Sequence, residues 1–310
     1  MLDKRSVILV KDESTYNTDS TPVAGTDALL IEDAKWAFEG VKMYQQKPVR
    51  PSLALLKPLY AGALIKLDGK VELKGASAAG TVPECGKIFR AAGFSETVVA
   101  VTSVTYKPVS DPSLHKSSTV YFYDDGLLLK MTGCRAKISF QFNVAAAPMA
   151  QVEFTGHFVS VTDVTLPAPT YASQLPVPLI NVPFTIGSFA AVISKLDFDM
   201  GNELVMPTSI AATDGYGTVD IVGRHLTGSF DPLRVSIATK DFIGQWRAGT
   251  SLALDTGVIG SVAGNRLEVT MPVVTYTNVG RANRSQFGTF DMKFHAAESA
   301  GDDEVSIVFT

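Results

Sequence analysis

The chain has 310 residues, of which 46% are hydrophobic and 19% are charged, which is enough for one large domain or for two domains of about 100 to 150 residues. It holds no apolar run of about 20 residues, so we expect a soluble chain without a membrane-spanning helix. The net charge of −4 provides no positive surface for a phosphate backbone and argues against tight binding of nucleic acid.

Residues 1–50 are predicted to form an N-terminal arm and a first strand. The apolar run at residues 7–10 is too short for the core of a signal peptide, so we expect no secretion. Residues 11–22 are polar and poorly patterned. Such a segment is typical of an arm that orders only against a partner.

Residues 51–166 are predicted to form a first β-rich domain. Residues 63–75 predict a pair of strands. Residues 118–123 and 137–144 predict further strands, because aromatic and β-branched side chains dominate them. The turn residues at 124–126, Asp-Asp-Gly, indicate a tight hairpin between two of these strands.

One short helix is predicted in this domain, over residues 83–92. Pro83 suits the first turn of a helix, and Gly93 can take the left-handed conformation that ends one. Cys85 and Cys134 match no metal-ligand spacing and are interpreted as buried or idle thiols.

A proline-rich linker over residues 167–178 divides the chain nearly in half, since closely spaced prolines favour an extended connector. Residues 179–310 are predicted to form a second β-rich domain. Residues 192–199 alternate apolar and polar side chains as a strand does, with residues 201–202 as its turn. Residues 217–228 predict another pair of strands.

A second short helix is predicted over residues 239–249. Thr239 is expected to be its N-cap. Phe242, Ile243 and Trp246 follow the spacing of one apolar helix face, so we expect Trp246 in the core.

The two predicted helices are about 155 residues apart, and similar strands surround each of them. A spacing of domain size indicates a duplicated domain. The alternative is two unrelated β domains that each contain a helix. The predicted fold is therefore mainly β, a β-sandwich or barrel with one short helix per domain, in two similar domains in tandem.

No local signature of catalysis or metal binding is present. The acidic stretch at residues 197–203 fails as a calcium loop, because Asn202 stands where the sharp turn needs Gly and Thr208 where Glu should complete the ligands. The four histidines form no paired motif, and no nucleophile elbow or phosphate-binding loop is found. We predict no enzyme activity, no cofactor and no metal.

Several segments in both halves together resemble one family. The chain resembles the major tail tube proteins of bacteriophages with long, non-contractile tails (siphophages), in the form that has a duplicated tube domain. The resemblance is one of pattern over most of the chain beyond the arm. It is carried by residues 34–39, 67–75, 118–126, 131–140, 196–203 and 222–232.

The resemblance implies a β-sandwich flanked by a helix, with long hairpins that join around a ring into a barrel enclosing the DNA channel. It implies that the chain binds itself, in homotrimeric pseudo-hexameric rings or alternatively in homohexamers, which stack into a tube. Further expected partners are the tape measure, terminator and distal tail proteins. DNA would pass through the lumen without specific binding. The implied location is the virion tail, assembled in the host cytoplasm.

A channel that DNA slides through without sticking would benefit from carboxylates that repel phosphates. Six acidic residues lie on the predicted hairpin strands and are therefore candidates for the channel lining. They are Asp68, Glu72, Asp197, Asp199, Glu203 and Asp220. The alternative for each is an ordinary solvated position on the outside.

Two other functions remain open at this point. A tail terminator or distal-ring protein would share the fold and form a single ring. A carbohydrate-binding β-sandwich could use Trp36, Trp246 or Tyr216 as a stacking platform, with Tyr216 at an exposed loop tip.

Overall fold

The computed structural model describes residues 5–310 and is mainly β, which confirms the predicted fold class. The helices are α1 (Gly86–Ala91), α2 (Phe242–Ala248) and the 3-10 turn η1 (Pro112–Leu114). The strands of the first half are β1 (Ser6–Asp12), β2 (Ala28–Leu29), β3 (Glu32–Tyr44), β4 (Leu59–Glu72), β5 (Phe94–Val99), β6 (Ser103–Pro108), β7 (Ser118–Asp124), β8 (Leu127–Asn143) and β9 (Met149–Asp163). Those of the second half are β10 (Thr185–Ile186), β11 (Phe189–Ala190), β12 (Lys195–Asp199), β13 (Glu203–Val205), β14 (Asp220–Gly223), β15 (Thr227–Phe230), β16 (Leu252–Asp255), β17 (Leu267–Arg284), β18 (Phe287–Ala297) and β19 (Ser306–Phe309).

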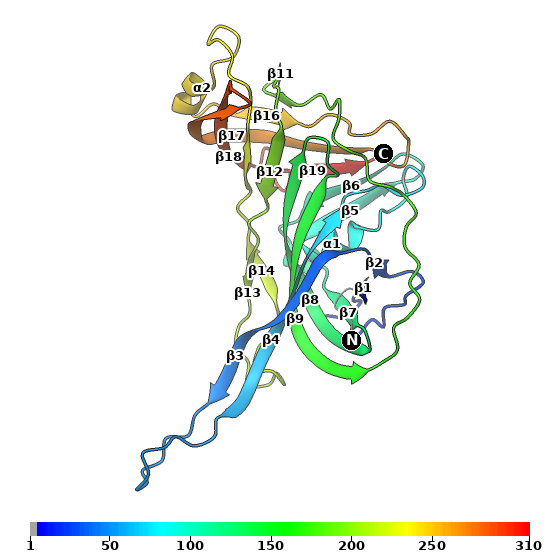
Figure 1. Ribbon diagram of the computed structural model, residues 1–310, viewed down its shortest axis with the longest axis vertical. Coiled ribbons are helices and arrows are strands. Elements are labelled where there is room, and N and C mark those ends of the chain that lie inside the picture. Colours follow the sequence, from blue (N-terminus) through cyan, green and yellow to red (C-terminus); the bar gives the residue numbers. More distant parts are fainter. Residues whose placement is uncertain (1–4) are drawn as a thin grey trace.

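Eight antiparallel strands form what we call the main sheet, in the order β3-β4-β9-β8-β12-β15-β18-β17. Alternate side chains of these strands are apolar, so one face of the sheet packs on the core and the other presents polar residues. β3 and β4 continue past the body of the molecule as a long hairpin (Figure 1). We call its tip and adjoining ends, residues 41–60, the extension.

The strands of the main sheet follow the same order in both halves. The first half contributes β3 and β4, then α1, then β8 and β9, and pairs them as β3-β4-β9-β8. The second half contributes β12 and β15, then α2, then β17 and β18, and pairs them as β12-β15-β18-β17. The two halves meet where β8 pairs with β12.

The hydrophobic core crosses that boundary. Phe140 on β8 stacks on Phe198 of β12 with ring centroids 4.6 Å apart, and Phe89 of α1 lies over Phe140 at 5.9 Å. β6 pairs with β19 in the same way, and one apolar cluster contains residues of both halves. The proposed domain boundaries at residues 51–166 and 179–310 stay predictions. Strands of the two halves pair in one sheet, and their side chains form one core.

Three strand assignments differ from expectation. Residues 59–72 form the single strand β4 rather than a pair, because Asp68 and Gly69 continue the ladder opposite Glu153 and Val152. β14 and β15 pair with different strands and not with each other. Residues 201–202 are no hairpin turn, because β12 and β13 on either side of them pair with other strands. The side-chain amide of Asn202 is buried and donates to the carbonyls of Ala92 and Ala136.

The turn at residues 124–126 and the two helices lie where the sequence predicts them. The turn at residues 124–126 joins β7 to β8, and Gly93 ends the α1 region with φ of 82°. α2 is capped by Asp241 rather than Thr239: the carboxylate of Asp241 accepts a hydrogen bond from the backbone N–H of Gly244 at 2.7 Å. An ionised carboxylate is the stronger acceptor at a helix N-terminus.

The N-terminal residues belong to the body of the molecule. β1 pairs along its whole length with β7. The buried carboxylate of Glu13 accepts hydrogen bonds from the hydroxyls of Ser117 and Thr119 and from the backbone N–H of Gly133. The expectation that residues 11–22 order only against a partner is therefore wrong, because their polar groups find partners within the chain.

The predicted linker, residues 167–178, has no regular secondary structure and runs along both halves. The backbone N–H of Thr170 bonds the carbonyl of Ala24, and the side chain of Asn265 donates to the carbonyl of Leu175. The connector is extended, as its prolines predict, and it is also tied to the body.

Candidate channel face and assembly surfaces

Four of the six candidate lining residues share the polar face of the main sheet. Asp68 and Glu72 lie on β4 and Asp197 and Asp199 on β12. The register connects them: Asp68 is opposite Glu153, which is opposite Lys137, and two residues further along β8 Ser139 is opposite Asp199. Residues at even spacing on paired strands point to the same side.

This polar face is balanced in charge rather than acidic. Lysines and carboxylates alternate over its strands, and most of them are exposed or half-buried. They include the lysines Lys35, Lys66, Lys70, Lys137, Lys195 and Lys293 and the carboxylates Glu39, Asp68, Glu72, Glu153, Asp197, Asp199 and Asp291. The sequence indicated the carboxylates but not the lysines that register brings among them.

The charges on this face are coupled to one another. Lys66 lies 2.5 Å from a carboxylate oxygen of Glu39 and 3.0 Å from one of Glu153. Partial burial raises the pKa of Asp68, and the Glu153 carboxylate adds to that rise while Lys66 opposes it. Burial likewise raises the pKa of Asp197. The charge of Lys66 is thus largely balanced by the neighbouring carboxylates.

Glu203 and Asp220 lie elsewhere. They belong to β13 and β14, which pair only with each other among residues 5–310. One carboxylate oxygen of Asp220 is 3.6 Å from the guanidinium of Arg135, and the other accepts a hydrogen bond from the hydroxyl of Thr218. The sequence placed these two acids with the others because both were expected on hairpin strands. Asp220 lies in the strand pair predicted at residues 217–228, and Glu203 follows the turn predicted at residues 201–202.

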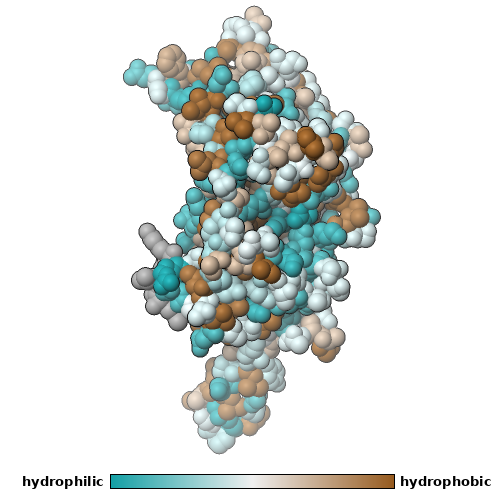
Figure 2. All heavy atoms as spheres, turned by 90° about the vertical axis from the view of Figure 1, so that its right-hand side faces the viewer, coloured by the Kyte–Doolittle hydropathy of each residue, from teal (hydrophilic) through white to brown (hydrophobic). Residues whose placement is uncertain are grey.

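The extension exposes many large hydrophobic side chains. Its large hydrophobic side chains have no covering layer, and Val49 and Leu53 are fully exposed. The others are Val41, Met43, Tyr44, Leu55, Leu59 and Tyr60. Figure 2 shows hydrophobic and hydrophilic residues mixed on this narrow foot of the molecule. So many large apolar side chains exposed on one projecting segment are typical of an interaction site.

A second exposed apolar group lies on α2, and a third on the outer strand β3. Trp246 is 38% and Ile243 is 45% exposed, so the expectation that Trp246 lies in the core is wrong: only Phe242 of that helix is buried. On β3, Trp36 is 41% and Phe38 is 45% exposed. The spacing in the sequence finds an apolar face but does not say which molecule covers it.

Tyr216 was expected at an exposed loop tip, but its side chain contacts β3. Its hydroxyl donates to the carbonyl of Gly40 at 2.6 Å, and the ammonium of Lys42 lies 3.5 Å from the centre of its ring. One face of the ring is thus covered, and Trp36 and Trp246 belong to opposite ends of the main sheet's strand order. The three aromatic residues of the carbohydrate hypothesis form no common platform.

One buried polar cluster had no sequence signal. The Nδ1 atom of His157 on β9 lies 2.5 Å from a carboxylate oxygen of Asp214, and its Nε2 atom lies 3.1 Å from the hydroxyl of Tyr16. That hydroxyl accepts a hydrogen bond from the N–H of Val219. The cluster fastens residues 214–219 onto the sheet, since its members are far apart in sequence and come together only in the fold.

The comparison with known families decides the identity. A family profile described as "Phage tail tube protein" matches residues 3–310, almost the whole chain. The chain belongs to the phage tail tube protein family. No curated protein matches the sequence.

Membership of this family gives the chain a structural role in the virion tail, where it assembles with itself into a tube and contacts other tail proteins. Within residues 5–310 no group of three or more His, Cys, Asp or Glu side chains is arranged to hold a metal ion. Over the same residues, no helix has the length and apolar character needed to cross a membrane. Cys85 and Cys134 are buried as free thiols.

Proposed function

We propose that the chain is the ring-forming subunit of the tail tube of a phage with a long, non-contractile tail, and that its halves are a duplicated tube domain. The observation that carries the proposal is the strand order of the main sheet, which is the same in both halves around one helix each. A repeated unit whose halves pair side by side suits a ring of three copies with six similar positions.

The dimensions of such a ring fit a DNA channel. Three copies of an eight-stranded sheet give a barrel of 24 strands. With strands about 4.8 Å apart and tilted by about 40°, the backbone circle is about 48 Å across. Subtracting about 5 Å of side chain on each side leaves about 38 Å, wide enough for a DNA duplex.

The polar face of the main sheet would line this channel, with Asp68, Glu72, Asp197 and Asp199 among its carboxylates. Glu203 and Asp220 are left out of this lining because β13 and β14 are not part of the main sheet. Lysines paired with carboxylates, such as Lys66 between Glu39 and Glu153, offer DNA phosphates no net positive surface. DNA would pass without specific binding.

The extension would contact the next ring along the tube. It is exposed, apolar and remote from α2 at the other end of the molecule (Figure 1). Contacts between unlike surfaces at the two ends of a subunit generate an open-ended stack. Assembly in the host cytoplasm with tape measure, terminator and distal tail proteins is part of the same proposal.

Negative-stain electron microscopy of the purified protein, with light scattering on the same sample, tests the proposal. We expect hollow tubes or stacked rings, and rings of three times the subunit mass. Rings of six times that mass would show that the halves are not equivalent in the ring. Single closed rings that never stack would favour the terminator or distal-ring alternative.

A further inference from the structure

Closing the proposed barrel places the free edge of β17 in one copy beside β3 of the neighbouring copy. We propose that α2 covers this contact by burying Trp36 and Phe38 of that neighbour against Ile243 and Trp246. The proposal rests on the proposed ring, and it names the two surfaces that close it.

The contact inside the chain provides the pattern. β8 is the last strand of the first half in sheet order, and it pairs antiparallel with β12, the first strand of the second half. By the same order β17 is the last strand of the second half and β3 the first strand of the first half. Since all neighbours in the main sheet are antiparallel, a β3 placed beside β17 continues the alternation of strand directions.

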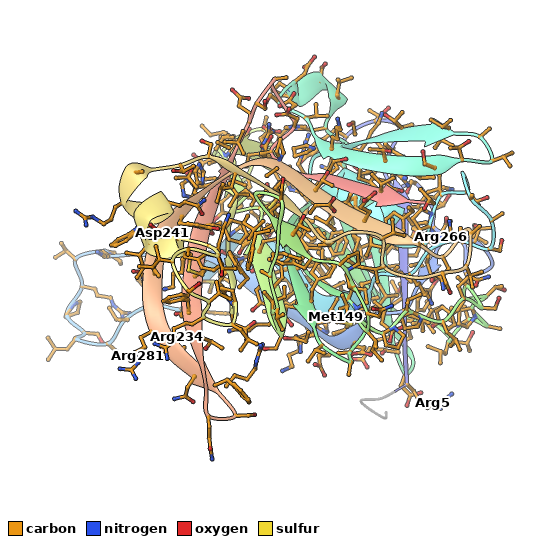
Figure 3. The ribbon with its side chains drawn as sticks, turned by 90° about the horizontal axis from the view of Figure 1, so that it is seen from above. Arg5, Met149, Arg234, Asp241, Arg266 and Arg281 are labelled. Carbon is orange, nitrogen blue, oxygen red and sulfur yellow. The ribbon has the colours of Figure 1, made fainter. Side chains whose placement is uncertain are left out.

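The outer edges of β3 and β17 are both free to pair with another strand. Within residues 5–310, β3 pairs only with β4, and beyond Val274 β17 pairs only with β18. Exposed edges of this length carry unpaired backbone N–H and C=O groups, which a neighbouring strand can satisfy. Viewed from above, Asp241 at the start of α2 lies on the same side of the molecule as Arg281 of β17, and Arg266 lies on the other side (Figure 3).

The apolar side chains of the two edges lie on the same face of the sheet. Trp36 and Phe38 are opposite the buried residues Leu67 and Ile65 of β4, on the core side. Phe242 of α2 packs on Tyr276 of β17, also on the core side, with ring centroids 6.2 Å apart. A neighbour's β3 beside β17 would therefore place its aromatic residues under α2.

The two helices make the comparison quantitative. Phe89 of α1 and Trp246 of α2 each precede an Arg-Ala pair at the helix end. Phe89 is fully buried among aromatic rings of β5, β6, β8 and β19. One of these rings, Phe140 of β8, stacks on Phe198 of the next strand, which is 2% exposed. Trp246 is 38% exposed, and beyond Val274 β18 is the only strand that pairs with β17 within residues 5–310. Trp36 and Phe38 are the aromatic residues that a following β3 would supply.

Tryptophan fluorescence measures this contact directly, because Trp36 and Trp246 are the only two tryptophans of the chain. In the single-tryptophan variants Trp36→Phe and Trp246→Phe, the remaining tryptophan should shift its emission to the blue on assembly. Its quenching by acrylamide should fall several-fold. Assembled protein in which either tryptophan stays as quenchable as in the isolated subunit would overturn the proposal.

Two blocked variants test the pairing of the surfaces. One carries Trp36→Asp and Phe38→Asp, and the other carries Ile243→Asp and Trp246→Asp; all four positions are exposed in the subunit, so both variants should fold. Each alone should stay a single copy in light scattering. Mixed, they should form a two-copy complex and nothing larger, because only one intact contact remains. Leu114→Asp, 59% exposed on η1, is the matched control and should assemble normally.

The outcomes separate this inference from the proposed function. Tubes formed by either blocked variant alone, or a mixture that forms no two-copy complex while the unaltered chain assembles, would overturn the edge contact and leave the tube role in place. Two-copy complexes in the mixture together with single, unstacked rings of the unaltered chain would support the contact and overturn the tube role. An unaltered chain that never associates would contradict both.

Discussion

Helices α1 and α2 take the same place in the strand order of the two halves, yet one is buried and the other is half-exposed. Ile88 and Phe89 of α1 are covered by residues of the same chain, whereas Ile243 and Trp246 of α2 are 45% and 38% exposed. Aromatic rings of β5, β6, β8 and β19 surround Phe89. Next to α2, by contrast, β17 beyond Val274 pairs only with β18 within residues 5–310. The apolar spacing of a helix in the sequence therefore does not show whether the same chain covers that face.

The largest expected effect separates the two helices. Phe89→Ala removes a fully buried ring that stacks on Tyr106 and Phe140, and should lower the free energy of unfolding by about 3 to 5 kcal/mol. Trp246→Ala should lower that of the isolated subunit by less than about 1 kcal/mol but abolish ring formation. Urea denaturation of both variants measures the difference. Equal losses of stability would contradict the comparison.

A second contrast concerns two arginines of the second half. Arg224 is 2.5 Å from Asp302, also bonds Glu304, and donates to the carbonyl of Val109. Arg224→Met leaves the buried Glu304 unpaired and should cost about 3 kcal/mol. Arg281→Met, on the exposed edge strand β17, should change subunit stability by less than about 0.5 kcal/mol. Thermal or urea unfolding of the two variants gives the comparison, and a cost at Arg281 as large as at Arg224 would contradict it.

The cluster around His157 tests how firmly the second half is tied to the first. His157→Ala leaves the carboxylate of Asp214, 8% exposed, without its nearest partner. The expected loss is about 2 to 3 kcal/mol in the free energy of unfolding. Proteolysis should then begin near residues 206–219. His157→Ala with undiminished stability and unchanged cleavage would show that this cluster does not hold the segment.

The smallest effect is a dependence on pH that both halves should share. Because burial raises the pKa of Asp68 and Asp197 in the folded chain, the folded state binds their protons more tightly, and stability falls as pH rises through those pKa values. Asp68→Asn and Asp197→Asn should each leave stability at pH 7 unchanged or slightly higher, and flatten the curve above about pH 4.

Asp302 is the control, because its pKa is shifted in the opposite direction from those of Asp68 and Asp197. Burial disfavours its ionised form, but hydrogen bonds from Ser110 and Arg224 outweigh this and lower its pKa. Its contribution to stability is therefore present at neutral pH and lost as pH falls through its folded pKa. Asp302→Asn should lower stability at pH 7. A gain there, or a loss for the two polar-face variants, would reverse the assignment of these environments.

Local patterns in the sequence were enough for the helices, for the turn at residues 124–126 and for the mainly β fold. Short-range rules govern these features, such as the left-handed stop at Gly93. They did not show that residues 63–75 form one strand, because a hairpin turn and a continuing strand at Asp68-Gly69 differ only in the strand that pairs alongside. Pairing of β4 with β9 decides it, and these strands are far apart in sequence.

The polar face could be predicted only in part for the same reason. Asp68, Glu72, Asp197 and Asp199 lie on strands whose alternation the sequence shows. Their lysine neighbours depend on register between distant strands, as with Lys137 opposite Glu153. The N-terminal residues were misjudged because hydrogen bonds to Glu13 come from residues more than 100 positions away.

The central claim is that three copies form each ring, with the polar face of the main sheet inside. Cryo-electron microscopy of the assembled protein with helical reconstruction tests it most directly. We expect threefold rings of six similar units, an inner wall of 24 strands, and Asp68 and Asp197 facing the lumen. A ring of six whole chains, or a reconstruction with Asp68 and Asp197 on the outer surface, would contradict it.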